Sequence, residues 1–201
     1  MSAAAGSTAG SSLSRGILWL LLPATVVILL ALAGDPLREE LRWSREALSQ
    51  GEWWRLVTGH IVHLDVMHAF LNLVAAALLF GIFGTSFGLR RALLAMLTGM
   101  IAIDLGLWFL GTVDWYVGLS GILHAYAAAA VVRSLIDRPD RTAMGIAVFG
   151  MGKIVWENTV GALPFVSAET IVVTDAHLFG VLAGLLVGLL TRSKRQSIGD
   201  E

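Results

Sequence analysis

Long apolar runs separated by short polar connectors dominate the chain. About 20 apolar residues in a helix cross the hydrocarbon core of a bilayer, so these runs predict an all-α integral membrane protein with a bundle of six transmembrane helices. The fifth run is short for a span and would need a locally thinned bilayer or snorkelling ends. The expected spans are 17–33, 66–83, 92–110, 118–136, 143–156 and 171–190.

Both ends of the chain are polar, and they frame a membrane domain that we expect over residues 15–192. Residues 1–14 are small and polar and are expected to form a disordered cytoplasmic tail, with a second cytoplasmic tail at 193–201. Arg15 precedes the first apolar run, which ends in Ala-Leu-Ala-Gly, so a signal peptide is a competing interpretation. A first transmembrane helix is simpler, because the run continues the pattern of the rest of the chain.

The stretch 34–60 differs in kind, because it is charged and contains three tryptophans. Its leucines at Leu37, Leu41 and Leu48 recur at helical spacing. This pattern is typical of an amphipathic segment that lies at the membrane interface, with tryptophan rings at the depth of the lipid headgroups. We expect it to form the first outer loop of the bundle.

Composition supports the membrane assignment and narrows the chemistry. Hydrophobic residues make up 56% of the chain and charged residues only 14%, against about 25% charged in soluble globular domains. The absence of cysteine excludes disulfides, thiolate metal sites and a cysteine nucleophile. The net charge of −1 gives no reason to expect a nucleic-acid partner. His60 and His63 lack further ligands at suitable spacing, so no metal is expected, and nothing indicates a cofactor.

Basic residues are distributed unevenly among the connectors. They concentrate in those that a cytoplasmic N-terminus would place inside, whereas acidic residues dilute or replace them elsewhere. The positive-inside rule therefore favours six spans with both termini in the cytoplasm. The basic residues on the inside would be Arg15, Arg90, Arg91, Arg133, Arg138, Arg141, Arg192, Lys194 and Arg195.

Three polar motifs lie at the expected outer ends of spans two, four and six, and polar groups at membrane depth are functional candidates. The first is Gly118-Leu119-Ser120-Gly121. Its glycines leave the serine hydroxyl unobstructed, and the helix start offers free N–H groups to a developing oxyanion. Taken alone, the motif is more often a plain helix start.

The second motif places His177 near one turn before Gly180, Gly184 and Gly188, which line one face of a helix and permit close approach of a neighbour. We expect the neighbour to be the helix that begins at Ser120, and a serine–histidine pair is a minimal activated nucleophile. A single helical histidine is more often structural. The matching face of the neighbour carries Gly121, Ala125, Ala128 and Ala129.

The third motif pairs His68 with Asn72 four residues later, on one helix face. Two donors at this depth suit an oxyanion site, although a polar pair can also serve helix packing alone. The coincidence of all three motifs favours a site open to the outer face, because peptide hydrolysis needs water that the bilayer excludes.

At these residues the sequence resembles the rhomboid intramembrane serine proteases, over about residues 17–190. The family pattern is His-x-x-x-Asn in the second span, Gly-x-Ser-Gly at the start of the fourth and Ala-His-x-x-Gly-x-x-x-Gly in the sixth. Trp54-Arg55 matches a Trp-Arg element of the family's first outer loop, and His63 stands at a spacing similar to that of bacterial members.

The resemblance implies that Ser120 attacks the scissile carbonyl and His177 takes its proton, as a dyad without an obligatory acid. The oxyanion would be held by the Ser120 backbone N–H, the His68 side chain and the Asn72 amide. Trp54-Arg55 would brace the outer loop. Supporting roles fall to Gly118, Gly121, Gly180 and Gly184. The substrates would be single-span membrane proteins cut near the outer face of a bacterial inner membrane.

One position departs from the bacterial pattern, because His124 stands where a tyrosine usually packs on the catalytic histidine, four residues after the serine. Tyr126 is two residues further on and is expected to face elsewhere. His124, together with the Lys153…Trp156-Glu157 element, resembles the rhombosortase branch. That branch is associated with bacterial proteins that end in Gly-Gly, a hydrophobic helix and a basic tail.

The remaining ionisable groups leave alternatives open. Lys153 and Glu157 can pair along one helix, either to hold that helix in place or to contact the substrate tail or a gate. Asp175 is expected to point away from the serine, and Asp104 to face the bundle interior. Span five and the loop 157–170 are expected to gate substrate access.

Two other classes of protein compete with the protease. An inactive rhomboid-like protein would bind membrane clients without cutting, and it would usually lack the serine or the histidine. A small transporter would use Asp104, Lys153 and Glu157 along a continuous inner path. A purely structural assembly factor would leave the coincidence of three motifs unexplained.

Overall fold

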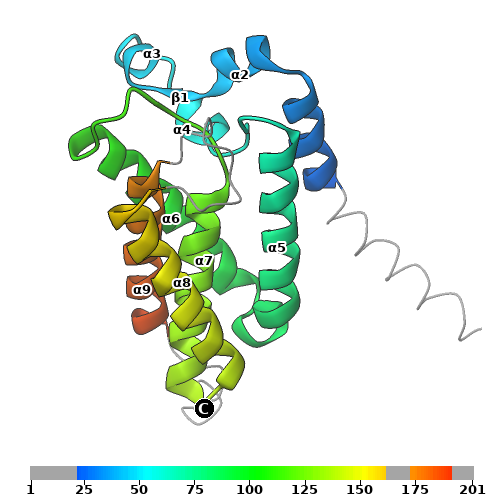
Figure 1. Cartoon of the computed structure of the whole chain (residues 1–201), viewed down its shortest axis with the longest axis vertical. Helices are drawn as coiled ribbons and strands as arrows, with labels where there is room; N and C mark the ends of the chain where they lie inside the picture. The colour runs from blue at the N-terminus through cyan, green and yellow to red at the C-terminus, as the bar shows by residue number, and fades with distance from the viewer. Residues whose placement is uncertain (1–21, 162–172, 192–201) are drawn as a thin grey trace, which may run out of the picture.

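The computed structural model describes residues 22–161 and 173–191, and long helices lie side by side in it with short elements gathered at one end (Figure 1). Within those ranges, each expected span coincides with one helix. The tails at 1–14 and 193–201 and most of the loop 157–170 lie outside the described residues. The long helices are Leu22–Leu32, α5 (Val66–Phe87), α6 (Leu89–Phe109), α7 (Ser120–Asp137), α8 (Arg141–Thr159) and α9 (Thr174–Leu190).

Two of these helices, α5 and α6, are long and apolar enough to cross a membrane by length and composition. The helix Leu22–Leu32 and α9 are apolar but shorter over the described residues. The membrane character of the chain therefore rests most firmly on α5 and α6, and the count of six spans stays a prediction.

Helix α8 is longer than the fifth span that the apolar pattern predicted. It has 19 residues, which is about 28 Å at 1.5 Å per residue. The Asp140 side chain caps its start by accepting from the N–H groups of Thr142 and Ala143, and the helix continues through Glu157 to Thr159. The helix is longer than the apolar run because polar residues at both ends belong to it, and whether it forms a short span stays a prediction.

The stretch 34–60 folds into several short elements instead of one amphipathic segment. They cover the end of the bundle where α5 begins and α8 ends (Figure 1). The strand β1 pairs in antiparallel fashion with β2, a strand from the connector between α6 and α7. The elements are α2 (Asp35–Leu41), β1 (Trp43–Ser44), α3 (Arg45–Ser49), α4 (Arg55–Thr58) and β2 (Trp115–Tyr116).

Trp43 differs from the expected interfacial position, because its side chain is fully buried. It sits in β1 opposite Tyr116 and meets the Trp108 ring edge-on at 6.4 Å between centroids. Strand pairing therefore turns this ring into the protein core. The other two tryptophans, Trp53 and Trp54, are 65% and 52% exposed, as an interfacial loop would have them.

The Arg55 side chain connects separate segments of this loop. Its guanidinium is buried, pairs with Glu52 at 2.6 Å, and donates to the backbone carbonyls of Glu39 and Arg42 at 2.7 and 3.0 Å. A buried guanidinium needs such partners for its charge and donors. The bracing role that the resemblance gave to Trp54-Arg55 thus has a concrete counterpart in the arginine.

Helices α7 and α9 pack backbone against backbone, as the spacing of the glycines predicted. A β-carbon added at Gly180 would overlap the carbonyl oxygen of Gly121, and one at Gly184 would overlap that of Ala125. A β-carbon at Gly188 would likewise crowd Ala129. The prediction of this helix pair and of its contact face is therefore confirmed. The contact brings the start of α7 next to the start of α9.

Candidate active site

The first turns of α7 and α9 and the last turn of α8 lie at the end of the bundle that the short elements cover (Figure 1), and one side chain from each helix meets the others there. Ser120 is the first residue of α7, and His177 lies in the first turn of α9. The Ser120 Oγ is 2.8 Å from Nε2 of His177. Glu157, in the last turn of α8, places Oε2 2.8 Å from Nδ1 of the same ring. Both ring nitrogens of His177 are thus engaged.

The turn before Ser120 depends on a glycine. Gly118 has φ of +121°, a conformation that side chains rarely adopt. Its N–H donates to the Gly59 carbonyl at 3.0 Å, and its own carbonyl accepts from the Tyr116 hydroxyl at 2.5 Å. These bonds fix the turn that presents the serine hydroxyl.

The His68 ring lies over this turn. A β-carbon at Gly118 would stand 3.2 Å from Nε2 of His68 and 3.9 Å from Oγ of Ser120. The imidazole and the hydroxyl therefore flank the bare face of the glycine. The first N–H groups of α7 have no partner one turn earlier within the helix, so donors gather around the space next to the serine.

Asn72 is buried on α5, one turn after His68. Its amide nitrogen donates to the His68 carbonyl at 3.0 Å. A primary amide has two hydrogens, so one is used within α5 and one is left for another acceptor. The structure therefore gives Asn72 a direct part in positioning the His68 backbone.

His63, in the loop before α5, supports both the turn and His68. Its Nε2 is 3.5 Å from the Leu119 nitrogen, and its ring meets the His68 ring edge-on at 5.0 Å. Burial, and to a smaller extent the positive charge of a protonated His68, lowers the pKa of His63 to about 4. His63 is consequently neutral at neutral pH, as a ring nitrogen that accepts from a backbone N–H must be.

His124 occupies the position at which the bacterial pattern has tyrosine, and it stacks on His177. The ring centroids are 4.3 Å apart with 21° between the planes, and Nδ1 is 2.7 Å from the Ser120 carbonyl. Since a carbonyl only accepts, this nitrogen carries the proton. Tyr126 faces elsewhere, as expected, and stacks on Phe80 at 4.6 Å.

The Lys153–Glu157 pair reaches beyond its own helix, which analysis of the sequence did not foresee. Lys153 Nζ binds Oε1 of Glu157 at 2.6 Å and also lies 3.3 Å from Nδ1 of His177. The signal in the sequence was a lone carboxylate near the end of an apolar helix, at about the depth of the candidate histidine. Asp175, although nearer in sequence, is not the carboxylate that binds His177.

A second buried pair lies behind the serine turn. The Asp104 carboxylate is 3.2 Å from Nε2 of His60, and the His60 ring meets the Tyr116 ring at 5.3 Å. Asp104 therefore faces the interior of the bundle, where burial of a carboxylate requires a partner of this kind. Burial raises the pKa of the Tyr116 hydroxyl, which keeps its proton for the Gly118 carbonyl.

The arrangement suits nucleophilic acyl transfer. The Glu157 carboxylate, which also binds the Lys153 ammonium, can accept a hydrogen from Nδ1 of His177, and in that tautomer Nε2 is free to accept the Ser120 proton. Nucleophile, base and an orienting group thus stand in a continuous line of hydrogen bonds, with further donors beside the serine.

Comparison with known proteins identifies a family for this chain. The rhomboid domain family matches residues 50–194. "Putative rhomboid protease YdcA" of Bacillus subtilis (strain 168) is 24% identical over 189 residues, which cover 90% of this chain and 86% of that protein. The matched region contains every residue that the structure gathers around Ser120.

Proposed function

This chain belongs to the rhomboid family of membrane proteins, and we propose that it is an intramembrane serine endopeptidase with Ser120 as nucleophile and His177 as general base. Rhomboid proteins are generally serine proteases that act on transmembrane substrates in the bilayer. The observation that carries the proposal is the 2.8 Å separation of Ser120 Oγ from His177 Nε2, in a site with oxyanion donors beside it.

The proposed reaction has two stages. The Ser120 oxygen bonds to the scissile carbonyl carbon while its proton passes to Nε2 of His177, and the resulting oxyanion is stabilised by the Ser120 N–H, His68 and Asn72. The peptide C–N bond then breaks, and the amine leaves with the proton from Nε2. Water attacks the acyl-enzyme in the same way and restores the serine.

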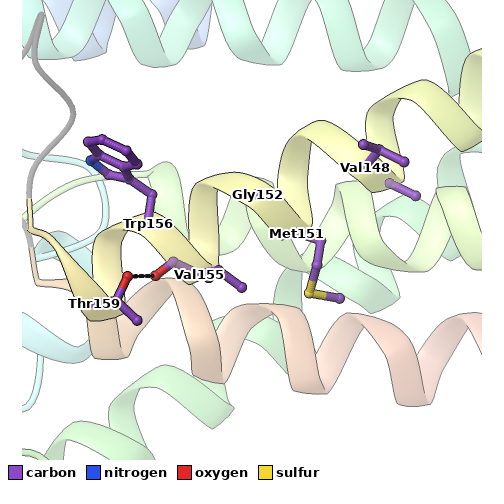
Figure 2. A pocket seen from close by; sticks show the side chains of 7 residues that line it. Val148, Met151, Gly152, Val155, Trp156 and Thr159 are labelled. Atoms are coloured by element: carbon purple, nitrogen blue, oxygen red, sulfur yellow. Dashed lines mark hydrogen bonds between the residues drawn. The ribbon is translucent and has the colours of Figure 1, made fainter.

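The substrate would reach the site from the side of α8 that faces α5. A shallow, open depression lies on the surface of that helix, and Figure 2 shows Trp156 turned toward α5, whereas Met151 points to the opposite side, where α9 lies. Helices α5 and α8 make no extensive contact with each other. The depression is lined by Ala147, Val148, Met151, Gly152, Val155, Trp156 and Thr159.

At a finer level, we propose that the enzyme belongs to the rhombosortase branch and removes C-terminal tails of the Gly-Gly, hydrophobic helix and basic type. Support comes from His124 in place of the usual tyrosine and from the Lys153…Trp156-Glu157 element. The site would open to the outer face of a bacterial inner membrane, with both termini of the enzyme in the cytoplasm.

The competing functions fit the side chains less well. An inactive relative would usually lack the serine or the histidine, whereas both are present and in contact. A transporter would present Asp104, Lys153 and Glu157 along one path, whereas Asp104 is paired with His60 and the other two lie with His177. These pairings favour two separate polar clusters.

The test is cleavage of a single-span reporter that ends in Gly-Gly, an apolar helix and a basic tail. Wild type should cut it, while Ser120→Ala and His177→Ala at equal membrane levels should reduce cleavage to background. The matched control is Asp175→Asn, which should cleave as wild type does. Cleavage that persists in Ser120→Ala would refute the mechanism, and a wild type that cuts only other transmembrane reporters would refute the rhombosortase assignment alone.

A further inference from the structure

The contact between α8 and His177 has no place in a serine–histidine dyad. Glu157 lies on the buried stripe of α8 with Ile154, and its side chain is only 3% exposed. Burying a carboxylate is unfavourable unless it is paired and hydrogen-bonded. Here both oxygens are used, one by Lys153 at 2.6 Å and the other by His177 at 2.8 Å.

We propose that Glu157 is a positioning residue that completes a Ser120–His177–Glu157 triad, and that Lys153 holds its carboxylate in place. The inference rests on the proposed protease function and adds a third residue to the Ser120–His177 pair. Glu157 accepts from Nδ1–H, which fixes the tautomer of His177 and points Nε2 at the serine. Lys153 occupies the other carboxylate oxygen, so the carboxylate cannot turn away.

The charges of Lys153, Glu157 and His177 suit the proposed reaction. With neutral His177, Lys153 and Glu157 cancel, and no net charge is buried. When Nε2 takes the serine proton, the imidazolium stands beside the Glu157 carboxylate while the oxyanion forms on the opposite side. The proton on Nδ1 stays where it is, because the carboxylate orients the ring and stabilises its charged form without taking the proton.

The first measurement is kcat and KM for reporter cleavage by the full chain in detergent or liposomes. For Glu157→Ala we expect kcat to fall about 100-fold, within the range that general acid–base catalysis supplies. KM should change little, because the carboxylate contacts the histidine and not the substrate. Glu157→Asp should recover part of the loss, while Asp175→Asn is the matched control and keeps wild-type kcat.

A double variant separates positioning from stability. Glu157→Ala leaves the half-buried Lys153 without its carboxylate partner, which can destabilise the fold by itself. Lys153→Met combined with Glu157→Leu removes both charges, so its melting temperature should return close to that of wild type while kcat stays low. If this double variant regained wild-type kcat, the pair would be structural and the proposal overturned.

A readout that needs no cleavage is the tautomer of His177, from ¹⁵N NMR of histidine-labelled protein assigned through His177→Ala. Wild type should carry the proton on Nδ1, and Glu157→Ala should lose that preference. An unchanged tautomer would overturn the proposal even if the chain cut no reporter. Conversely, a wild type that shows the expected tautomer but no proteolysis would refute the proposed function alone.

Discussion

The two partners of His177 reach it through very different helix contacts. Ser120 arrives on α7, which meets α9 at Gly180 and Gly184 with no side chain between the backbones. Glu157 arrives on α8, which meets the same histidine through ionisable groups. A backbone contact of this kind cannot shift without opening a void, whereas a polar contact can be broken and remade. The nucleophile–base distance is thus set by a backbone contact, while the orienting group is supplied through side-chain contacts.

The largest effect should come from filling the α7–α9 contact. In Gly184→Ala the new methyl group would overlap the Ala125 carbonyl, so the helices must separate. Overpacking of this kind costs about 1–3 kcal/mol or more, and Ser120 moves away from His177 with its helix. We expect a lower melting temperature and loss of nearly all cleavage, measured on purified protein in detergent.

The matched control is Gly145→Ala on α8, where an added β-carbon meets nothing within 4 Å. This substitution changes the same residue type in a helix, and alanine is the better helix former. It should leave cleavage and stability at the wild-type level or slightly above. Equal losses in the two variants would show that the glycines matter for helix propensity and not for the contact.

A cross-link between α8 and α5 tests whether these helices must separate to admit a substrate. Cysteine at Trp156, paired in turn with cysteine at Phe70, Leu71 or Val74 of α5, can be cross-linked cleanly because the chain has no native cysteine. We expect cleavage of a transmembrane reporter to fall about 10-fold or more when the tether closes the side that the substrate would use, and to return on reduction.

Labelling of Ser120 by a small fluorophosphonate should survive the tether, because the reagent needs no lateral opening. The single-cysteine variants serve as controls for the substitutions themselves. Undiminished reporter cleavage with the tether in place would rule out α8 as a gate, and loss of fluorophosphonate labelling would show instead that the tether distorts the site.

The comparison also explains what could be predicted from the sequence. Helices whose apolar runs are long appear where they were expected, and the glycines at intervals of four identify both the α7–α9 pair and its contact face, because backbone approach depends on spacing along one helix. The sequence did not identify Glu157 as a partner of His177. Periodicity indicates which helix face a residue occupies but not which side chain it contacts on the neighbouring helix. Trp43 was misplaced for a related reason, since its burial depends on pairing with a strand more than 70 residues away.

Substitution of His124, on α7, is expected to have a smaller effect. His124→Ala removes both the stacking on His177 and the bond to the Ser120 carbonyl, and stacking alone is worth about 0.5–1.5 kcal/mol. We expect kcat to fall about 10-fold. His124→Phe keeps the stacking and should fall only about 3-fold. Equal losses in the two variants would assign the role to the hydrogen bond and not to the ring contact.

The smallest expected effect concerns His63, whose folded-state pKa of about 4 lies below the ordinary value of 6.5 because of burial. Between these values the unfolded chain binds more protons than the folded one. The contribution of His63 to stability is therefore complete above pH 6.5 and is lost as the pH falls toward 4. At pH 6 the loss is about 0.8 kcal/mol.

His63→Gln cannot titrate, so the stability difference between wild type and this variant isolates the histidine from the other titrating groups. Melting temperatures in mild detergent should show the advantage of wild type shrinking by about 2 °C between pH 7.5 and pH 6. A difference that stays constant over this range would mean that folding leaves the pKa of His63 unchanged, and burial of the ring would then not disfavour its charged form.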